Sequence, residues 1–391
     1  LSSLDNTTYA TLDGGFLIGV IPSVFGNSDL KWEKTTAYNI GLDLALLNNR
    51  INITAEVYRK DTDDMLLLAD IPAHTGLTSQ WQNVGSVRNE GWEVLLKTTN
   101  ISTKNFTWTT DININAYRSE VLDLGETPFL LTGGRGFFQN ISRIEEGQAL
   151  NLIYGYKTNG ILQINDFNWQ NDSDPTIPFA DRVWALNDGI PVQPGTNTQP
   201  GDANFVDVSG PDGAPDGLIN ADDQTFIGDA TPDFFGGINN TFNIGNLDIS
   251  FFLKYSVGND LFYGLQYYNT SRPNFNRDRD FIAEEWSFDN QDARDPRYEW
   301  NNSGEASDVY VHDGSFIRLQ SVTIGYTFPK ELTKKLNINR CRMYITGNNL
   351  FTVTEYPGTN PDISSRGLFS GFDNSTFPVP IEAFVGLQLS F

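Results

Sequence analysis

The stretch Glu382–Phe391, E-A-F-V-G-L-Q-L-S-F, alternates between two sets of residues. One set is apolar throughout, and the other is mixed and includes charged, polar and small residues. The apolar set is Ala383, Val385, Leu387, Leu389 and Phe391, and the other set is Glu382, Phe384, Gly386, Gln388 and Ser390. A period of two residues places the two sets on opposite faces of a sheet. This segment is therefore predicted to be a long strand with one apolar face.

The same alternation recurs towards the N-terminus. It is clearest in Leu247–Tyr255 and in Trp108–Ala116, and further runs occupy Tyr38–Leu46, Ile51–Lys60, Trp92–Thr98, Phe234–Ile244, Phe316–Phe328 and Cys341–Leu350. A soluble sandwich would also alternate, so periodicity alone does not separate it from a membrane barrel. Many of the runs approach or exceed about ten residues, which is the length a tilted strand needs to cross a bilayer.

The connections between these runs alternate between short and long. Short ones are Asn48–Arg50, Ser102–Asn105, Glu145–Ala149, Gly245–Asn246 and Pro329–Asn339, and long ones are Asp61–Val87, Ser119–Gly136, Gln163–Asp233, Val257–Gly314 and Phe351–Ile381. Outer-membrane barrels have short periplasmic turns and long extracellular loops. If the C-terminus is periplasmic, an even number of strands must lie between Ser119 and Asp233. A hairpin of Phe137–Ile144 with Asn151–Leu162 would supply two.

These features predict an all-β fold, a transmembrane antiparallel β-barrel with long extracellular loops. The chain would provide about eleven C-terminal strands of a barrel of about 22. Residues 1–34 are expected to form a loop or strand leading into the barrel, and residues 35–391 its C-terminal half. An open sheet with bare edges is not viable in lipid, so the remaining strands are expected from sequence outside this chain.

Composition narrows the function classes. The chain has 391 residues, with 49 acidic against 26 basic side chains and a net charge of −23, which argues against a nucleic-acid surface. Its single cysteine, Cys341, excludes an intrachain disulfide. Its only histidines, His74 and His312, argue against a histidine-rich zinc site, and both are interpreted as structural or solvated. The sequence lacks a G-x-S-x-G elbow, a Walker loop and a dinucleotide-binding glycine motif, so it is not expected to be an enzyme.

Several segments, in order along the chain, resemble SusC/RagA-type TonB-dependent transporters. The segments are Asn27–Thr35 (N-S-D-L-K-W-E-K-T), Tyr38–Asp43, Leu47–Ile51, Gln82–Glu93 (Q-N-V-G-S-V-R-N-E-G-W-E), Asp313–Leu319 (D-G-S-F-I-R-L), Gly347–Phe351 (G-N-N-L-F) and Tyr356–Gly358. The resemblance covers nearly the whole chain from Asn27 onward. One departure is Pro380–Ala383, where the family usually has an Arg-Thr pair before the last strand.

This resemblance implies a 22-stranded barrel in the outer membrane of a Bacteroidota-type bacterium, importing an oligosaccharide or a peptide. It also implies a SusD-like surface lipoprotein as a lid over the extracellular loops, and the TonB system as the energy source. The plug and the TonB box of the family are not present in this sequence, so energy coupling would depend on the missing N-terminal part.

An acidic segment, Asp207–Asp223, resembles a calcium loop. Calcium takes six to eight oxygen ligands arranged around a tight glycine turn. If Gly210–Pro215 is an insertion, Asp207, Ser209, Asp216, the Leu218 carbonyl and Asp223 fall at ligand positions, with Gly217 at the turn. Such an ion would stiffen an extracellular loop and take no part in catalysis. The alternative is an acidic surface loop that binds nothing tightly.

Aromatic residues of the long loops are candidates for contact with substrate or partner, because an apolar sugar face can stack on a rigid ring. They are Phe262, Tyr263, Tyr267, Tyr268, Phe275 and Trp286. The alternative for each is packing inside the loops. For the whole chain, two other functions stay open: a structural barrel subunit of a larger outer-membrane complex, and a secreted carbohydrate-binding or hydrolytic β protein.

Overall fold

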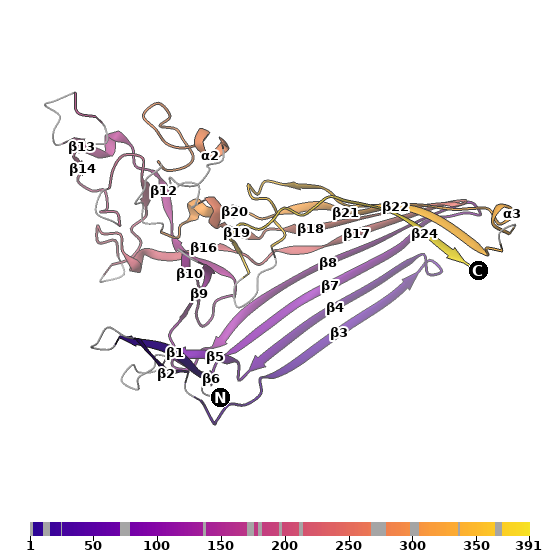
Figure 1. Ribbon diagram of the computed structural model, residues 1–391, viewed down its shortest axis with the longest axis horizontal. Coiled ribbons are helices and arrows are strands. Elements are labelled where there is room, and N and C mark those ends of the chain that lie inside the picture. The colour runs from indigo at the N-terminus through magenta and orange to yellow at the C-terminus, as the bar shows by residue number, and fades with distance from the viewer. Residues whose placement is uncertain are drawn as a thin grey trace. The chain divides into compact units, whose positions relative to one another are not determined.

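The structure is a computed structural model of the chain. It describes residues 3–10, 16–24, 26–70, 79–135, 138–169, 176–178, 182–194, 198–210, 214–266, 279–297, 305–334, 337–363 and 370–391. The chain divides into two compact units. Unit 1 comprises Leu1–Thr98, Asp111–Leu130 and Ile144–Leu150, and unit 2 comprises Thr99–Thr110, Leu131–Arg143 and Asn151–Phe391. Long strands dominate both units (Figure 1).

Unit 1 contains four long strands in the order β3-β4-β7-β8. They are β3 (Lys34–Leu46), β4 (Ile51–Asp63), β7 (Ser86–Ser102) and β8 (Phe106–Asp123), of which β7 and β8 run on into unit 2. Two shorter hairpins pair β1 (Ser3–Ala10) with β2 (Phe16–Val24) and β5 (Leu66–Asp70) with β6 (Ser79–Asn83). The unit has an apolar core of Leu67, Val87, Val121, Leu124 and Ile144.

In unit 2, the first residues of β8 are followed by β17, β18, β21, β22 and β24 in hydrogen-bonded order. The bounds are β17 (Phe234–Ile244), β18 (Leu247–Val257), β21 (Phe316–Thr327), β22 (Arg340–Thr354) and β24 (Glu382–Ser390), and the pairs from β17 to β24 are antiparallel. Short turns join β17 to β18 and β21 to β22. The second turn contains the helix α3 (Lys330–Thr333).

Smaller sheets make up the rest of unit 2. One has the order β16-β11-β10-β9, two others are the pairs β12-β15 and β13-β14, and the last has the order β20-β19-β23. The bounds are β9 (Leu130–Arg135), β10 (Phe138–Ile144), β11 (Leu152–Tyr156), β12 (Thr158–Ile161), β13 (Phe167–Trp169), β14 (Trp184–Leu186), β15 (Ala203–Phe205), β16 (Gln224–Asp229), β19 (Asp260–Tyr263), β20 (Val311–Asp313), β23 (Phe372–Asp373) and the helix α2 (Arg279–Ala283). Short 3-10 helices cover Ile164–Asp166, Ala221–Asp223 and Asp308–Tyr310.

The register of the long strands aligns apolar side chains in rows. Phe242, Ile249, Ile324, Ile345 and Val385 are successive cross-strand neighbours from β17 to β24. Ile324, Ile345 and Val385 of this row are 42%, 50% and 76% exposed. A water-soluble protein rarely leaves so continuous an apolar surface uncovered. The row is therefore suited to contact with lipid.

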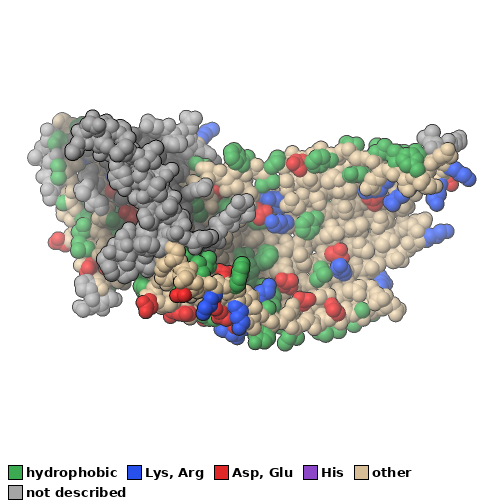
Figure 2. All heavy atoms as spheres, turned by 60° about the horizontal axis from the view of Figure 1, so that its bottom comes forward, with side chains coloured by type: hydrophobic (Ala, Val, Ile, Leu, Met, Phe, Trp, Pro, Cys, Tyr) green, Lys and Arg blue, Asp and Glu red, His purple; other side chains and the backbone are tan. Residues whose placement is uncertain are grey.

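The opposite face of the same strands is mainly polar. The chain neighbours of the apolar row form a second row on this face. Its members are Thr241, Ser250, Thr323, Thr346 and Phe384. The hydroxyls of Thr323 and Thr346 lie 2.9 Å apart. In the view of Figure 2, hydrophobic side chains lie mainly along the borders of the sheet surface, and backbone, uncharged polar side chains and scattered charged side chains occupy most of the area between them. One apolar and one polar face is the division expected of a barrel wall between lipid and a wet interior.

Several predictions from the sequence are confirmed. The fold is all-β and antiparallel, the last strand spans Glu382–Ser390, and Leu47–Arg50 forms a tight turn in which Leu47, Asn48 and Asn49 have positive φ. The hairpin expected from Phe137 to Leu162 forms as β10 and β11, but it hydrogen-bonds within the four-stranded sheet and not among the long strands. Among the residues that the structure describes, no helix is long and apolar enough to cross a membrane.

Candidate ligand pocket and acidic loop

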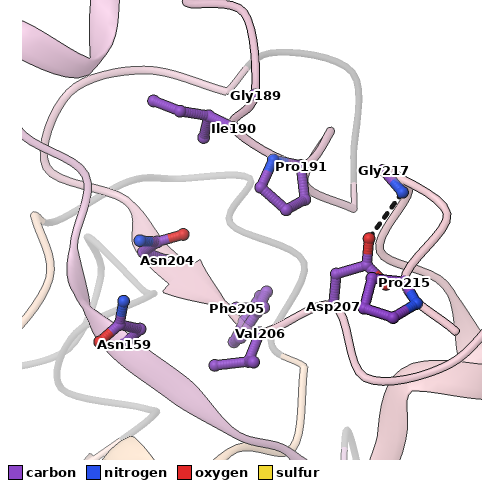
Figure 3. Close-up of a pocket in the computed structure, with 10 residues that line it drawn as sticks. All are labelled: Asn159, Gly189, Ile190, Pro191, Asn204, Phe205, Val206, Asp207, Pro215 and Gly217. Atoms are coloured by element: carbon purple, nitrogen blue, oxygen red, sulfur yellow. Dashed lines mark hydrogen bonds between the residues drawn. The ribbon is translucent and has the colours of Figure 1, made fainter.

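A pocket of about 600 Å³ lies in unit 2, lined by the small sheet of β12 and β15 and by two loops (Figure 3). One loop contributes residues 189–191, which follow β14, and the acidic segment contributes Pro215 and Gly217. Backbone hydrogen bonds hold these loops together. The Val192 N–H donates to the Gly217 carbonyl at 2.9 Å, and the Ile219 N–H donates to the Val192 carbonyl at 2.8 Å. The pocket is thus bounded by segments that are distant in sequence.

A buried side chain connects the loop to the sheet beneath it. Gln193 is only 4% exposed. Its Nε2 donates to the Pro191 carbonyl at 3.0 Å, and its Oε1 accepts the Phe205 N–H at 2.8 Å. Because a buried amide is costly when it is unpaired, these bonds fix the position of the loop against β15.

The pocket combines amide, apolar and acidic groups. Figure 3 shows Asn159 and Asn204 on one side and Asp207 with Pro215 on the other. Oδ1 of Asn204 accepts a long hydrogen bond from Gln193 Nε2 at 3.5 Å. Among the described residues, the Asn159 side chain and Nδ2 of Asn204 have no hydrogen-bond partner, so these groups are available to a ligand. The apolar lining comes from Ile190, Pro191, Phe205, Val206 and Pro215.

The Phe205 ring already contacts another aromatic ring of the protein. It packs against the ring of Tyr156, with the ring centroids 5.0 Å apart. Burial, together with the nearby carboxylates of Glu305 and Asp223, raises the pKa of Tyr156 to about 12. The phenol is neutral at physiological pH, as an unperturbed tyrosine also is.

Asp207 belongs both to the pocket and to the predicted calcium loop. Its carboxylate accepts the Gly217 N–H at 2.6 Å and the Asp216 N–H at 3.3 Å. Gly217 has φ +85°, which suits the glycine turn assigned to it. A Cβ on Gly210 would lie 2.8 Å from the Asp216 Cβ, so the chain returns to Gly210 across the stretch expected to be an insertion.

Asp223 closes the acidic segment and is fully buried. Its Oδ1 accepts the N–H groups of Val208 and Ser209 at 2.9 and 3.1 Å, and its Oδ2 accepts the Asn220 N–H at 2.8 Å. Three backbone donors satisfy this carboxylate without a cation. Ser209 thus meets Asp223 through its backbone, and Leu218 donates its N–H to the Asp216 carboxylate at 2.9 Å.

Within the described parts of the chain, no group of three or more His, Cys, Asp or Glu side chains has the placement to hold a metal ion. In the acidic segment, the carboxylates that were expected to bind calcium instead accept hydrogen bonds from neighbouring backbone N–H groups. A carboxylate oxygen that accepts one N–H keeps a second lone pair, so these bonds are compatible with calcium at Asp207. Calcium binding stays a prediction.

The loop aromatics lie in different surroundings. Phe262, Tyr263 and Trp286 are buried, and each packs inside unit 2: Phe262 against Tyr310 and Phe372, Tyr263 against Tyr356 and His312, and Trp286 against Phe288. Trp286 Nε1 also donates to Gln163 Oε1 at 3.0 Å. Packing inside the loops thus describes these three side chains here, and contact with a ligand would require the loops to open. Tyr267, Tyr268, Phe275 and His74 lie outside the described residues.

Sequence reasoning missed Asn159, Gln193 and Asn204. Asn159 falls in the stretch Asn151–Leu162 that was predicted as one strand, and Gln193 and Asn204 fall in the long connection Gln163–Asp233. The strands that position Asn159 and Asn204 have only four and three residues. Such short strands show no measurable period of two. The asparagine next to a glycine at Asn159 was a turn signal, but nothing local indicated its partner near Asn204.

The fold and its faces define the class of protein: an outer-membrane-type transmembrane β-barrel. The family described as "TonB dependent receptor-like, beta-barrel" matches residues 4–143. TonB-dependent receptor P39 of Formosa agariphila is 34% identical over 95% of this chain and 37% of its own length. TonB-dependent receptor SusC of Bacteroides thetaiotaomicron is 28% identical over 95% of this chain and 33% of its own length.

The solved structure of the RagAB peptide transporter has the same fold, with a TM-score of 0.72 at 24% identity, covering all of this chain and 38% of the other. The chain belongs to the TonB-dependent receptors and is similar to their SusC and RagA members. It spans about a third of the length of the curated relatives it matches. Proteins of this family are receptors and transporters of the outer membrane, not enzymes, and the chain is assigned to that membrane.

Proposed function

We propose that this chain forms part of the barrel of an importer that carries a bulky nutrient, an oligosaccharide or a peptide, across the outer membrane. The observation that carries the proposal is the pair of adjacent rows in unit 2. Ile324 and Ile345 lie on an exposed apolar face, and Thr323 and Thr346 lie on the polar face. Such a wall separates lipid from a wet interior, which is what a nutrient pathway requires.

Two partners belong to this proposal. A SusD-like surface lipoprotein would cover the extracellular loops, chiefly 163–233 and 257–314, and the TonB system would supply energy through the part of the protein outside this chain. The relatives support these partners by their names and fold. The loops themselves form small sheets with buried cores, as in the cluster of Ile141, Ile153, Ala230 and Phe262, and so offer a firm surface to a lid.

Deletion of the gene in its native bacterium tests the function. The deletion strain should lose growth on one class of nutrient, either oligosaccharides or peptides, and the intact gene should restore it. Removal of TonB should give the same loss, because import against a gradient needs energy. Unchanged growth and uptake on every nutrient, with the protein still in the outer membrane, would instead favour a structural barrel subunit.

Partitioning gives a separate test of the location. The full protein should stay with outer-membrane fractions and need detergent for extraction. It should also migrate differently on gels with and without heating, as folded barrels do. A folded protein that stays in buffer without detergent would contradict the assignment and favour a secreted β protein.

A further inference from the structure

We infer that the pocket between β12, β15 and the acidic loop captures a short peptide segment through a lysine or arginine side chain. As cargo recognition, this inference rests on the proposed import function. As binding, it rests only on the pocket. The residues that carry it are Asp207, Asn159 and Asn204 with the apolar wall between them.

The pocket has a fixed shape. Gln193 accepts a hydrogen bond from Phe205 and so attaches the loop that contains residues 189–191 to β15. A β-bridge between Val192 and Leu218 joins this loop to the acidic segment. The Asp207 carboxylate closes the far end by accepting the N–H groups of Asp216 and Gly217. A site whose walls are already ordered loses little entropy when a ligand enters.

The charge at one end selects the sign of the ligand. Asp207 lines the pocket, Asp216 stands between two lining residues, and Asp188 directly precedes Gly189. No lysine or arginine is among the lining residues that the structure describes. A cation is therefore attracted to this end of the pocket, whereas an anionic glycan or an acidic peptide is repelled.

The apolar wall selects an alkyl chain over a sugar ring. Ile190, Pro191 and Val206 offer aliphatic surface, and the ring of Phe205 is already packed against Tyr156. Sugar recognition favours an open aromatic face, and the contact with Tyr156 occupies part of the Phe205 ring. A lysine side chain matches the arrangement, because its alkyl stem can lie along the wall while its ammonium group reaches Asp207.

The two amides select a peptide main chain. Asn159 and Nδ2 of Asn204 have no partner among the described residues, and a carboxamide carries both a donor and an acceptor. A peptide group presents the complementary N–H and C=O. An extended peptide could therefore bond to Asn159 and Asn204 while one basic side chain points towards Asp207.

The test measures binding of defined peptides to the complete transporter with its lipoprotein partner, by calorimetry in detergent. The probe is acetyl-Gly-Leu-Lys-Leu-Gly-amide, compared with analogues that carry norleucine or glutamate in place of lysine, and with maltoheptaose. The lysine peptide should bind about fivefold more tightly than the norleucine peptide, the value of a partly exposed ion pair. Salt should reduce this preference.

Two variants locate the site. D207N keeps an acceptor for the loop N–H groups but removes the charge, so the preference for lysine over norleucine should fall to near one. N159D adds a second carboxylate and should raise the affinity for the lysine peptide about threefold, a gain that misfolding cannot imitate. D222N removes an exposed charge from the same loop without touching the pocket, and it should behave as the unaltered protein.

Equal binding of the lysine, norleucine and glutamate peptides, or tighter binding of maltoheptaose that D207N weakens, would overturn the inference. So would binding of the lysine peptide to the barrel protein alone but not to the complex, since a segment of the partner would then fill the pocket. The import proposal fails separately, if no nutrient is taken up while the lysine peptide still binds and N159D still strengthens it.

Discussion

Arg342 of β22 reaches Asp248 of β18 across the intervening strand β21, with its Nε 2.9 Å from Asp248 Oδ1. The side chain crosses directly over Gly325, where an added Cβ would lie 2.3 Å from the guanidinium Nη2. The path is open only because Gly325 has no side chain. Three strands of the polar face are thereby joined by a single ion pair, in addition to their backbone hydrogen bonds.

Replacement of Gly325 by alanine should therefore break this connection. The Arg342 guanidinium would have to move aside and lose its bidentate contact with Asp248, at a cost of about 1 kcal/mol in the free energy of unfolding. Urea unfolding in lipid vesicles measures the loss. Gly41 of β3 is a matched control, because its added Cβ would meet ordinary contact distances, the nearest 3.4 Å from Glu56. Equal effects of G325A and G41A would contradict this account of Gly325.

The apolar row predicts that a charge costs more on its face than on the opposite face. I345R should destabilise the barrel by about 2–4 kcal/mol, because Ile345 lies inside β22 on the exposed apolar face and arginine would have to enter hydrocarbon. S250R places arginine on the opposite, polar face of the sheet and should lower the free energy of unfolding by less than about 1 kcal/mol. Folding yield and urea midpoints in vesicles compare the two. If S250R is the more damaging change, the faces have been assigned the wrong way round.

Removal of the Gln193 amide should loosen the pocket without unfolding the barrel. Q193L leaves the Phe205 N–H and the Pro191 carbonyl without their partners, at a local cost of about 1–3 kcal/mol. Hydrogen exchange at Phe205 should accelerate, whereas the long strands should exchange as before. Q193E keeps the acceptor for the Phe205 N–H and should protect that amide from exchange better than Q193L does. Equal exchange in the two variants would mean that packing alone, and not the hydrogen bond, holds the loop against β15.

His312 predicts a pH-dependent loop core. Burial, and to a lesser extent Arg294, lowers the pKa of His312 to about 4, while Asp295 acts in the opposite direction. The ring nitrogen Nε2 lies 2.6 Å from Oε1 of the buried Gln266. As pH falls from about 6.5 to about 4, the unfolded loop takes up the proton first, so up to about 3 kcal/mol of local stability is lost in that window. Above about pH 6.5 this contribution to the local stability is fully present.

Limited proteolysis of the loops at pH 7 and pH 5 measures this effect. Cleavage near residues 259–266 and 311–313 should increase at the lower pH. In H312Q, which does not titrate, the increase attributable to this group should disappear. The prediction fails if H312Q shows the same rise in cleavage as the unaltered protein.

Calcium should stabilise the acidic segment if the predicted loop binds it. Added Ca²⁺ should bind with a dissociation constant of about 0.1–1 mM, as in extracellular calcium modules, and chelation should lower the melting temperature of the loops. D207N should weaken the affinity at least about tenfold, because a charged ligand is lost. D222N, outside the proposed ligand set, should not. Calorimetric titration without heat of binding would leave Asp207–Asp223 as an acidic surface loop.

The long strands could be predicted because their signal is local. Each residue of Glu382–Phe391 occupies a face set by its neighbours, and the turns at Leu47–Arg50 and Gly245–Asn246 adjoin the strands they connect. Strand order was harder. Chain direction required an even number of strands between β8 and β17, and zero satisfies that requirement as well as two. The β10–β11 hairpin could thus be placed in the wrong sheet without breaking any local rule.

The pocket could not be predicted for a different physical reason. Asn159 and Asn204 come to the same pocket because β12 pairs with β15 across more than forty residues of connecting chain, and Gln193 meets Phe205 only through a bond to its backbone N–H. Neither strand is long enough for a period, and an amide that bonds to backbone has no sequence signature. The acidic residues of 207–223 were visible because charge and glycine cluster locally. Their actual contacts, with backbone N–H groups, depend on the closed conformation.

Asp207 has a double position, in the wall of the pocket and at the first place of the acidic loop. If both ligands bind, a divalent ion and an ammonium group must share the negative charge of one carboxylate. Calcium would then act as an antagonist of lysine capture, and by reciprocity a bound peptide would weaken calcium to the same degree. Cation concentration at the cell surface would in that way set how readily basic peptides are retained.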